Sequence, residues 1–407
     1  MRATSVVEML LCIQGMRVVD VTMLPESRQI VVDVERKKRR HSCPLCHFTT
    51  SARYDRQSSP RQWRHINLGV FQVQLRLALC RLECAKHGVI TEAVPWAEHG
   101  SYFTRDFEEM VTWMARQMPK TAVERLAQIA WRTVGNILRR TVDRLLDDKR
   151  FEGLVEIGID EVSYRKGHQY LSIIANHRDG KVVWASEGKS AETANGFFDR
   201  LGPEACAEIK VVTMDMGGAF IKSVSDKCPH ATIAFDPFHV VKLANTAVDE
   251  VRREEVRLRK GTPDGRTIKG TRWTLLKTPE SHTDVDRLRL SEVAQINHRL
   301  YRAYLFKEQL RALYWIPPEC AAEHLEACLA WASRSRIAAL VKLGRTLRKH
   351  RDGILAAIRF GLSNGRLEGI NNKIGVLKHR SYGFHSAAAL IALVYLCCAH
   401  LQVNLPW

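Results

Sequence analysis

Hydrophobic and polar positions change period several times along the chain, and each change predicts a different kind of element. Residues 18–24 and 29–34 alternate between apolar and polar side chains, which is typical of two short strands joined by the turn Pro25-Glu26-Ser27. The segment FQVQLRLAL at 71–79 alternates in the same way and predicts a further strand. The amino-terminal part of the chain is therefore predicted to contain several strands.

The period becomes helical from Phe103 onward, where a first amphipathic helix is predicted to end at Pro119. Its apolar stripe comprises Phe107, Val111, Met114 and Ala115. A short helix follows to Ile129, and Thr121 and Glu124 have the spacing of a capping box. After a short break, a basic helix is predicted from Trp131, and this order is the layout of a helix-turn-helix.

The basic helix has one apolar face and one polar face. Val134, Ile137 and Leu138 are predicted to pack inward. The residues predicted to face outward and to contact DNA are Arg132, Thr133, Asn136, Arg139 and Arg140. Any two amphipathic helices can show this pattern, so the DNA-reading interpretation depends on the basic character of the whole chain.

The next region predicts a mixed sheet. Three strands are expected at 154–159, 170–175 and 181–186, followed by a helix at 191–201 and two more strands at 209–215 and 232–236. Three meandering strands, a helix, and then strands alternating with helices is the order of an RNase H-like α/β core. From 240 to 360 the pattern is almost entirely helical and rich in Arg and Lys, which predicts an all-helical insertion.

A break at 361–365 precedes a last pair of helices. The apolar stripe of the first helix comprises Leu367, Ile370, Ile374 and Leu377, which leaves Glu368, Asn372 and Lys373 off the stripe. The apolar run 387–399 is shorter than the roughly 20 residues of a membrane span, so it predicts a buried helix.

The stretch VEIGIDE at 155–161 places carboxylates at the end of an apolar strand, where an unpaired buried charge would cost several kcal/mol. Asp160 and Asp215 each end a predicted strand, and the two strand ends can lie side by side. Glu368 is predicted in the first turn of a helix, behind a Ser363/Asn364 cap. Carboxylates that converge from separate elements are typical of phosphodiester cleavage with two Mg²⁺ or Mn²⁺ ions.

Three neighbouring features leave alternatives open. Asp236 in the DPFH motif competes with Asp215 for the second catalytic position, or it caps the helix that follows. Glu161 would point to the opposite face of the strand from Asp160, as a partner for a base. Gly217 and Gly218 either allow backbone to approach a phosphate closely or form an ordinary turn.

The composition of the chain indicates what kind of partner the protein binds. The 407 residues include 62 Lys and Arg against 44 Asp and Glu, a formal net charge of +18, and the pI is about 9.6. Such an excess favours a polyanion as the partner. The length predicts more than one domain, and 45% apolar residues are enough for full cores. No Gly-rich phosphate loop is found, which argues against a nucleotide-dependent enzyme.

The 11 cysteines, without a secretory signal, indicate a reducing cytoplasm, with association to the nucleoid and no membrane partner. Cys43 and Cys46 in CPLC, with Cys84 and His87 in CAKHG, have the spacing of two turns that supply four ligands to Zn²⁺. Cys80 and His47 are rival ligands, and both turns could instead be ordinary loops. The preceding run ERKKRRH favours contact with phosphates over a solvated loop.

Four blocks resemble the DDE transposases of the ISL-three family of bacterial insertion sequences: GIDEVSYRKGHQY, VVTMDMGGAF, AFDPFHVVK and SNGRLEGINNKIGVLKHRSYGF. CPLC followed by RLECAKHG is similar to the zinc-binding segment of that family, although His87 stands where a second cysteine is common. The resemblance covers nearly the whole chain. It implies an RNase H-like core, divalent-metal DNA cleavage and strand transfer, and a triad of Asp160, Asp215 and Glu368.

The resulting prediction is a multidomain α+β transposase that binds the terminal inverted repeats of its element and target DNA, as a homo-oligomer on paired ends. Lys373, Lys378 and Arg380 are expected to hold DNA beside the triad, or to form a solvated basic helix. The expected domains are a zinc module at 1–100, the helix-turn-helix at 101–150, the catalytic core at 151–245 and 361–407, and the helical insertion at 246–360. A DNA-binding regulator without catalysis, or a structure-specific nuclease, is the alternative.

Overall fold

The two alternating segments near the start of the chain form the first two strands of a four-stranded sheet. In the computed structural model, which describes residues 3–362, 365–381, 384 and 386–405, β1 (Met16–Leu24) and β2 (Gln29–Arg36) are antiparallel. The order is β1-β2-β7-β6, and β7 (Gln72–Leu77) runs parallel to β2. Trp63 and Leu75 are among the buried side chains of this core. The strands predicted here are confirmed.

Short strands surround the cysteine turns in two further small sheets. β3 (His41–Ser42) pairs with β4 (Thr49–Thr50). β8 (Cys80–Cys84) lies between β5 (Asp55–Arg56) and β9 (Gly88–Thr91). β3 also packs against β8, so the two cysteine turns come together although they are distant in sequence. The other elements of this region are α1 (Ala3–Leu11) and β6 (Arg61–Arg64).

Three helices, α2 (Arg105–Gln117), α3 (Lys120–Ala127) and α4 (Trp131–Leu145), pack against one another. The predicted apolar face of α4 is buried. The predicted capping box is wrong, because the N-cap of α3 is Pro119 and carries no side-chain cap. Glu124 instead accepts a hydrogen bond from the Trp131 N–H at 3.1 Å and so satisfies a free donor at the start of α4.

The chain divides into two compact units. The first runs to Leu146 and includes the segment from Leu401, and the second runs from Asp147 to His400. The second unit contains a five-stranded mixed sheet of order β12-β11-β10-β13-β14. Its strands are β10 (Glu156–Arg165), β11 (Gln169–Asn176), β12 (Val182–Glu187), β13 (Val211–Met214) and β14 (Thr232–Phe235).

The strands of this sheet have two orientations. β10, β11 and β12 form an antiparallel meander, whereas β13 and β14 run parallel to β10. β10 is longer than predicted and continues to Arg165, so Asp160 lies within the strand rather than at its end. The pairing with β13 stops at Gly158, and beyond this residue β10 extends past its parallel neighbour.

Helices cover the sheet and continue into the insertion. α17 (Ala387–Cys398) packs against β12, where the Tyr395 hydroxyl accepts the Ala185 N–H at 2.9 Å. The helices are α5 (Ala191–Leu201), α6 (Pro203–Glu208), α7 (Gly218–Lys227), α8 (Pro237–Leu258), α9 (Pro263–Gly270), α10 (Arg272–Leu276), α11 (Asp284–Ile296), α12 (His298–Ala312), α13 (Ala321–Arg334), α14 (Ala338–Lys349), α15 (Arg351–Phe360), α16 (Gly365–Arg380) and α17 (Ala387–Cys398). Short 3₁₀ turns span Asp148–Phe151, Pro279–Ser281 and Pro318–Cys320.

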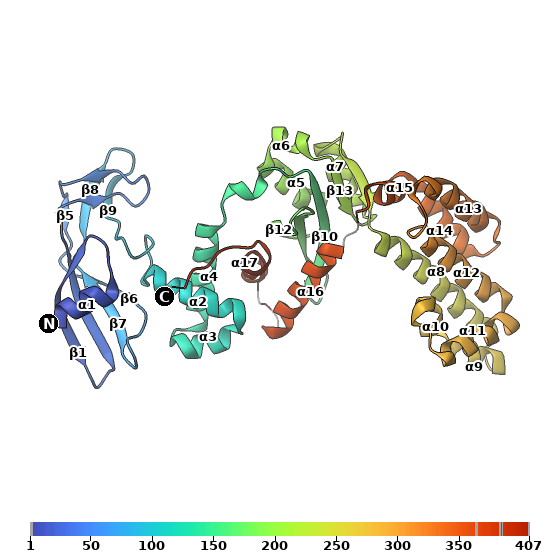
Figure 1. Ribbon diagram of the computed structural model, residues 1–407, viewed down its shortest axis with the longest axis horizontal. Coiled ribbons are helices and arrows are strands. Elements are labelled where there is room, and N and C mark those ends of the chain that lie inside the picture. The colour runs from blue at the N-terminus through green and yellow to red at the C-terminus, as the bar shows by residue number, and fades with distance from the viewer. Residues whose placement is uncertain (1–2, 363–364, 382–383, 385, 406–407) are drawn as a thin grey trace. The chain divides into compact units, whose positions relative to one another are not determined.

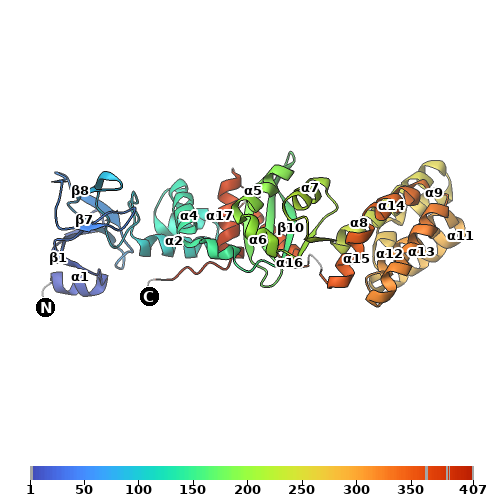
Figure 2. The ribbon, with the colours of Figure 1, turned by 90° about the horizontal axis from the view of Figure 1, so that it is seen from above.

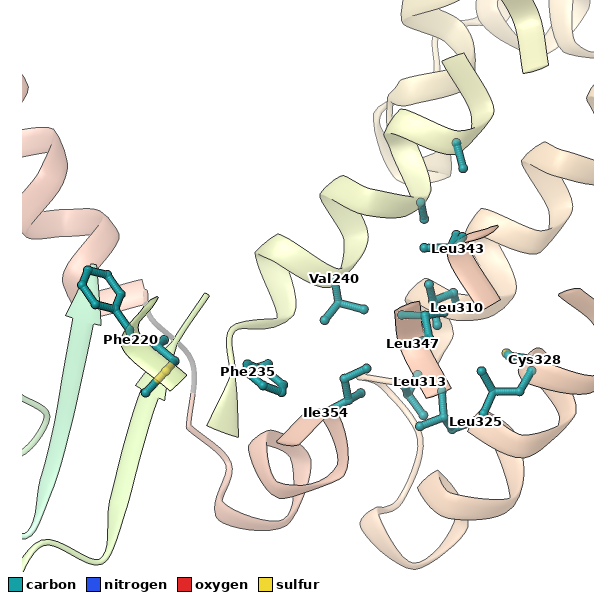
Figure 3. Close-up of a cluster of buried hydrophobic side chains, with 14 of the residues drawn as sticks. Phe220, Phe235, Val240, Leu310, Leu313, Leu325, Cys328, Leu343, Leu347 and Ile354 are labelled. Carbon is teal, nitrogen blue, oxygen red and sulfur yellow. The ribbon is translucent and has the colours of Figure 1, made fainter. Parts of the chain in front are cut away.

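The insertion shares a hydrophobic core with the edge of the sheet. Figure 3 shows Phe235 at the end of β14 near Val240 of α8 and Ile354 of α15. Gly353 allows this packing, because a Cβ added there would meet the Phe235 ring at 2.4 Å. Figure 2 shows α12, α13 and α14 gathered in one bundle. α8 runs unbroken across residue 245, so it connects the sheet directly to the helical insertion.

Among the described residues, no helix combines the length and the apolar character that a membrane span requires.

Candidate functional site

The strand register places the first two predicted acids at the same level of the sheet. Gly158 of β10 is paired with Thr213 of β13 in the parallel ladder. Asp160 and Asp215 each follow that pair by two residues, and adjacent strands lie about 4.8 Å apart. The burial of Asp160 and the charge of Asp215 both raise the pKa of the Asp160 carboxyl. The two aspartates therefore share one negative site where β10 leaves its parallel neighbour.

Asp160 is held by two hydrogen bonds. Its Oδ1 accepts the Glu161 N–H at 2.7 Å, and its Oδ2 accepts from Asn371 Nδ2 of α16 at 2.6 Å. Burial raises the pKa of Asp160, and these two donors and the nearby His239 act in the opposite direction. A side chain from a segment more than 200 residues later therefore orients this carboxylate.

Asp215 is fixed by the turn that leads into α7. Its Oδ1 accepts the Gly217 N–H at 2.8 Å, and a Cβ added to Gly217 would lie 2.7 Å from the same oxygen. Gly217 therefore gives room to the Asp215 carboxylate, which is a more specific role than an ordinary turn.

Glu161 adds a third carboxyl group to this region. Burial raises the pKa of Glu161, and the charges of Asp215 and Asp160 raise it further, whereas Lys189 lowers it. The ion pair expected for Glu161 is not formed with any residue that the structure describes. The site thus contains more negative charge than its described side chains neutralise.

Asp236 lies at the next position across the sheet, because Met214 pairs with Phe235. The Asp236 Oδ1 accepts the Phe238 N–H at 3.3 Å at the start of α8. His239 Nε2 lies 3.9 Å from Asp236 Oδ2. The helix-capping interpretation of Asp236 is confirmed, and the side chain is buried beside the aspartate pair.

The helix α16, which carries Glu368, runs alongside β10 (Figure 1). Leu367 packs over Gly158, where an added Cβ would meet the Leu367 side chain at 2.4 Å. Arg366 donates to the carbonyls of His177 and Arg178 near the first turn of the helix, and Lys378 donates to the Ser163 carbonyl near its end. These contacts hold α16 along the part of β10 that β13 leaves uncovered.

Glu368 itself is exposed and lies three residues before Asn371, so the two side chains share one side of α16. Among the described residues, the carboxylate oxygens of Asp160, Asp215 and Glu368 do not all come within 4.8 Å of one another. The predicted cap at Ser363 and Asn364 lies outside the described residues. The predicted apolar stripe of α16 is confirmed as buried.

The four predicted zinc ligands meet in the first unit. The ligand atoms of Cys43, Cys46, Cys84 and His87 all lie within 4.8 Å of one another. Cys43 Sγ is 3.5 Å from His87 Nδ1, and Cys46 Sγ is 3.5 Å from Cys84 Sγ. Ligands of a tetrahedral zinc ion, with bonds of about 2.3 Å to sulfur, are separated by similar distances.

Ligand protonation in this cluster is consistent with metal binding. Burial would raise the pKa of Cys84, but the backbone donors of Lys86 and His87 and the Cys46 thiol lower it to about 6. The rival ligand Cys80 lies in a separate group with His41 and Glu92, and His47 belongs to neither group. The residues present therefore fit a Cys₃His zinc site.

Comparison with known proteins agrees with this arrangement along most of the chain. Residues 157–394 match a family model described as a transposase. Residues 92–142 match the helix-turn-helix domain of transposase family ISL3, and residues 39–87 match the zinc finger of the transposases IS204, IS1001, IS1096 and IS1165. The chain belongs to the ISL3 family of transposases. The family resemblance of the sequence blocks is thereby confirmed.

Individual relatives carry the same description. The chain is 38% identical over 378 residues to the transposase for insertion sequence element IS1557 of Mycobacterium tuberculosis, which covers 87% of this chain and 85% of the relative. It is 30% identical over 332 residues to the transposase for IS1001 of Bordetella parapertussis, with 81% of this chain and 82% of the relative covered. The similarity therefore includes the helix-turn-helix of this transposase as well as its sheet.

Most of the predicted DNA-contacting residues of the transposase lie on the free face of α4. Arg132, Asn136 and Arg139 are exposed, and Asn136 Oδ1 accepts from Arg139 Nη2 at 2.7 Å. Thr133 is half-buried. Arg140 does not face outward as predicted, because its Nε donates at 3.1 Å to the buried Glu108 of α2.

The basic residues of α16 in the transposase also differ in their surroundings. Lys373 is exposed, whereas Arg380 is half-buried. Lys378 already donates to the Ser163 carbonyl, which gives it a structural role in docking the helix. Of the three residues expected to contact DNA, Lys373, Lys378 and Arg380, only Lys373 is therefore exposed.

Sequence reasoning missed Asn371, which contacts Asp160 directly. The signal was available, because Asn371 follows Leu367 by four residues and so shares its sheet-facing side of the helix. An amide at that position of an otherwise apolar stripe indicates a polar partner on the sheet.

Proposed function

We propose that this transposase is of the DDE type, and that Asp160, Asp215 and Glu368 are its catalytic carboxylates. The proposal rests on one observation above all: Asp160 and Asp215 occupy the same level of two adjacent parallel strands, and the helix carrying Glu368 lies along the first of them. The strand order, three antiparallel strands followed by two that are parallel to the first, supports an RNase H-like core.

The donor set fits divalent cations. Burial and the charge of Asp215 raise the pKa values of Asp160 and Glu161, and a cation would supply the counter-charge. Hard oxygen ligands of this kind suit Mg²⁺ or Mn²⁺. Such ions, when bound, activate water or a 3′-hydroxyl and stabilise the leaving oxygen of an in-line displacement.

The residues of the chain have distinct tasks in this proposal. Asp160 is kept in one orientation by Asn371 and the backbone, and Asp215 by the turn at Gly217. Glu368 approaches from α16 when DNA and cations are bound, because its exposed side chain is free to change rotamer. Exposed Lys373 on the same helix is placed to contact the DNA backbone near the acids.

The remaining parts supply recognition. Cys43, Cys46, Cys84 and His87 hold one Zn²⁺ that joins the two turns of the amino-terminal module. Arg132, Thr133, Asn136 and Arg139 contact the terminal inverted repeats, and a homo-oligomer pairs two ends. The proposed domains are the zinc module at 1–100, the helix-turn-helix at 101–150, the catalytic core at 151–245 and 361–407, and the helical insertion at 246–360.

The test compares DNA cleavage with DNA binding. Glu368→Gln keeps the shape and helix propensity of the side chain but removes its charge, so folding and end binding are expected to survive. Nicking of a labelled inverted-repeat duplex in Mg²⁺ should fall by on the order of a thousandfold, or about 4 kcal/mol of barrier. Asp160→Asn and Asp215→Asn should behave alike.

Asp236→Asn is the matched control, because asparagine also caps helices well and the variant should retain substantial activity. A gel shift of the same duplex monitors binding throughout. Cleavage by Glu368→Gln at the wild-type rate would remove Glu368 from the triad. Wild-type protein that binds the ends but never cleaves them would favour a regulator over an enzyme.

A further inference from the structure

A pocket of about 400 Å³ in the amino-terminal unit gathers arginines from two separate segments. Arg36 is the last residue of β2, Arg39 follows in the basic run, and Arg53 and Arg56 come from the segment around β5. The tertiary structure brings these two segments together, and Arg56 pairs with Cys80 across the β5–β8 ladder.

Glu92, a buried acid that lines this arginine pocket, already has its own partners. Glu92 is buried, and its Oε2 lies 2.6 Å from both Arg36 Nη2 and His41 Nδ1. Its Oε1 accepts the Cys80 N–H at 2.8 Å. Both carboxylate oxygens are therefore engaged inside the protein, and Glu92 cannot neutralise the arginines at the rim.

The rim arginines are exposed and have no ion-pair partner among the described residues: Arg39, Arg53 and Arg56. Two other arginines of the same unit have acidic partners, since Arg76 pairs with Asp33 and Arg81 pairs with Asp55. Burial and the charge of Glu92 raise the pKa of the Cys80 thiol, and the charges of Arg53, Arg56 and Arg36 oppose this rise. The other acid that lines the pocket, Glu35, is ion-paired with Arg17. Guanidinium groups whose neighbouring acids are already paired form a strong site for a phosphate.

The basic residues of the run ERKKRRH line two different pockets. Arg39 lines the arginine pocket, whereas Lys38 and Arg40 line a different depression, and Lys37 pairs with Glu8. The run is therefore not one uniform cationic surface. Arg39 lines the same pocket as Arg53 and Arg56, which come from the segment around β5.

We propose that the arginine pocket binds one phosphate of the DNA backbone, held jointly by Arg39, Arg53 and Arg56. The inference rests on the DNA-binding function of the transposase and adds a specific phosphate site to it. A backbone phosphate carries no sequence information, so this contact would position the zinc module on DNA without selecting bases.

The test measures how the affinity of the full-length protein for DNA depends on salt. Fluorescence anisotropy with an inverted-repeat duplex and a random duplex, from about 50 to 200 mM NaCl, gives the slope of log affinity against log salt. Arg53→Gln and Arg56→Gln are compared singly and together. Arg28→Gln, which removes an exposed arginine from the β1–β2 turn of the same unit, is the control.

A shared phosphate predicts a distinctive result. In the double variant, the slope of log affinity against log salt should become less steep by about 0.9, the value for one phosphate. In neither single variant should the slope change by more than this amount. Binding should weaken by the same factor on both duplexes. Arg28→Gln should leave the slope unchanged, and zinc content should be equal in all variants.

A loss of about 1.8 in the double variant would show two independent contacts and overturn the shared site. An unchanged slope in the double variant would show that the pocket does not touch DNA, while the transposase function would stand. Wild-type protein that bound neither duplex would instead overturn the DNA-binding function itself.

Discussion

At the scale of single residues, the acids of the sheet depend on neighbours that hold them in place. Asp160 lies within a strand and is half-buried, so its carboxylate needs donors that favour one orientation. Asn371 supplies one from α16, at 2.6 Å. The amide thus links the helix that carries Glu368 to the strand that carries Asp160.

Replacing Asn371 tests this positioning role. Asn371→Ala should lower cleavage by about 10–100-fold, since residues that orient metal-binding carboxylates have effects of that size. The Mg²⁺ concentration needed for half-maximal cleavage should rise, whereas gel-shift affinity for the ends should not change. Asn372→Ala, an exposed neighbour, is the control. An unchanged Mg²⁺ requirement for Asn371→Ala would show that the contact is only structural.

His177 provides a prediction for pH. Burial, followed by the charge of Arg366, lowers the pKa of His177 from 6.5 to about 4 in the folded protein. Because the folded pKa is the lower one, the stability of the folded state is complete above pH 6.5 and declines as the pH falls toward 4.

The effect of His177 is measured as a difference between variants. The free energy of unfolding of wild type, relative to His177→Gln, should fall by about 1.4 kcal/mol per pH unit between pH 6.5 and 4. Urea titrations at several pH values give this difference. A difference independent of pH would mean that His177 is as easily protonated in the folded state as in the unfolded state.

At the scale of elements, α4 is presented by its packing on α2 and α3. Val134, Ile137 and Leu138 are buried, which leaves Asn136 and Arg139 on the opposite face. Lys120 of α3 lies 4.7 Å from the Trp131 ring centroid, and Glu124 accepts the Trp131 N–H. The turn between α3 and α4 is thus fixed at both sides, as a helix that enters the major groove requires.

Asn136→Ala should relax discrimination between the inverted-repeat duplex and random DNA by about 1–3 kcal/mol. Arg125→Ala on α3, where side chains face the DNA backbone in this motif, should weaken binding to both duplexes alike. Competition gel shifts measure both effects. Equal losses on the two duplexes for Asn136→Ala would show that α4 is not the reading helix.

At the scale of the whole molecule, two units with separate cores predict separate unfolding events. The cysteine cluster lies in the first unit, and its zinc would stabilise that unit alone. The second unit has its own core, which includes the sheet and the helical insertion.

Removing zinc should therefore lower one thermal transition and leave the other unchanged. Purified protein is expected to contain about one zinc per chain, and Cys43→Ser should lose it together with the stability of the first unit. Cys12→Ser, at an exposed cysteine outside the cluster, is the control. Elemental analysis and calorimetry measure the two quantities, and full zinc content in Cys43→Ser would reassign the ligands.

Features with a local physical cause could be predicted from the sequence. Alternation and helical period located most elements, and the stripe of Leu367, Ile370, Ile374 and Leu377 is buried as expected. The paired cysteine turns and the four sequence blocks were enough to identify the family. These properties depend on nearby residues, because side-chain direction within one element follows from its period alone.

Contacts between distant segments were decided only by the tertiary structure. Register placed Asp160 level with Asp215, and the docking of α16 brought Asn371 to Asp160 and Lys378 to Ser163. Packing also turned Arg140 toward Glu108 and left Arg53 and Arg56 beside Arg39. These contacts depend on which surfaces pack together from segments that are distant in sequence. The hydrophobic period of a single segment carries no information about its partner.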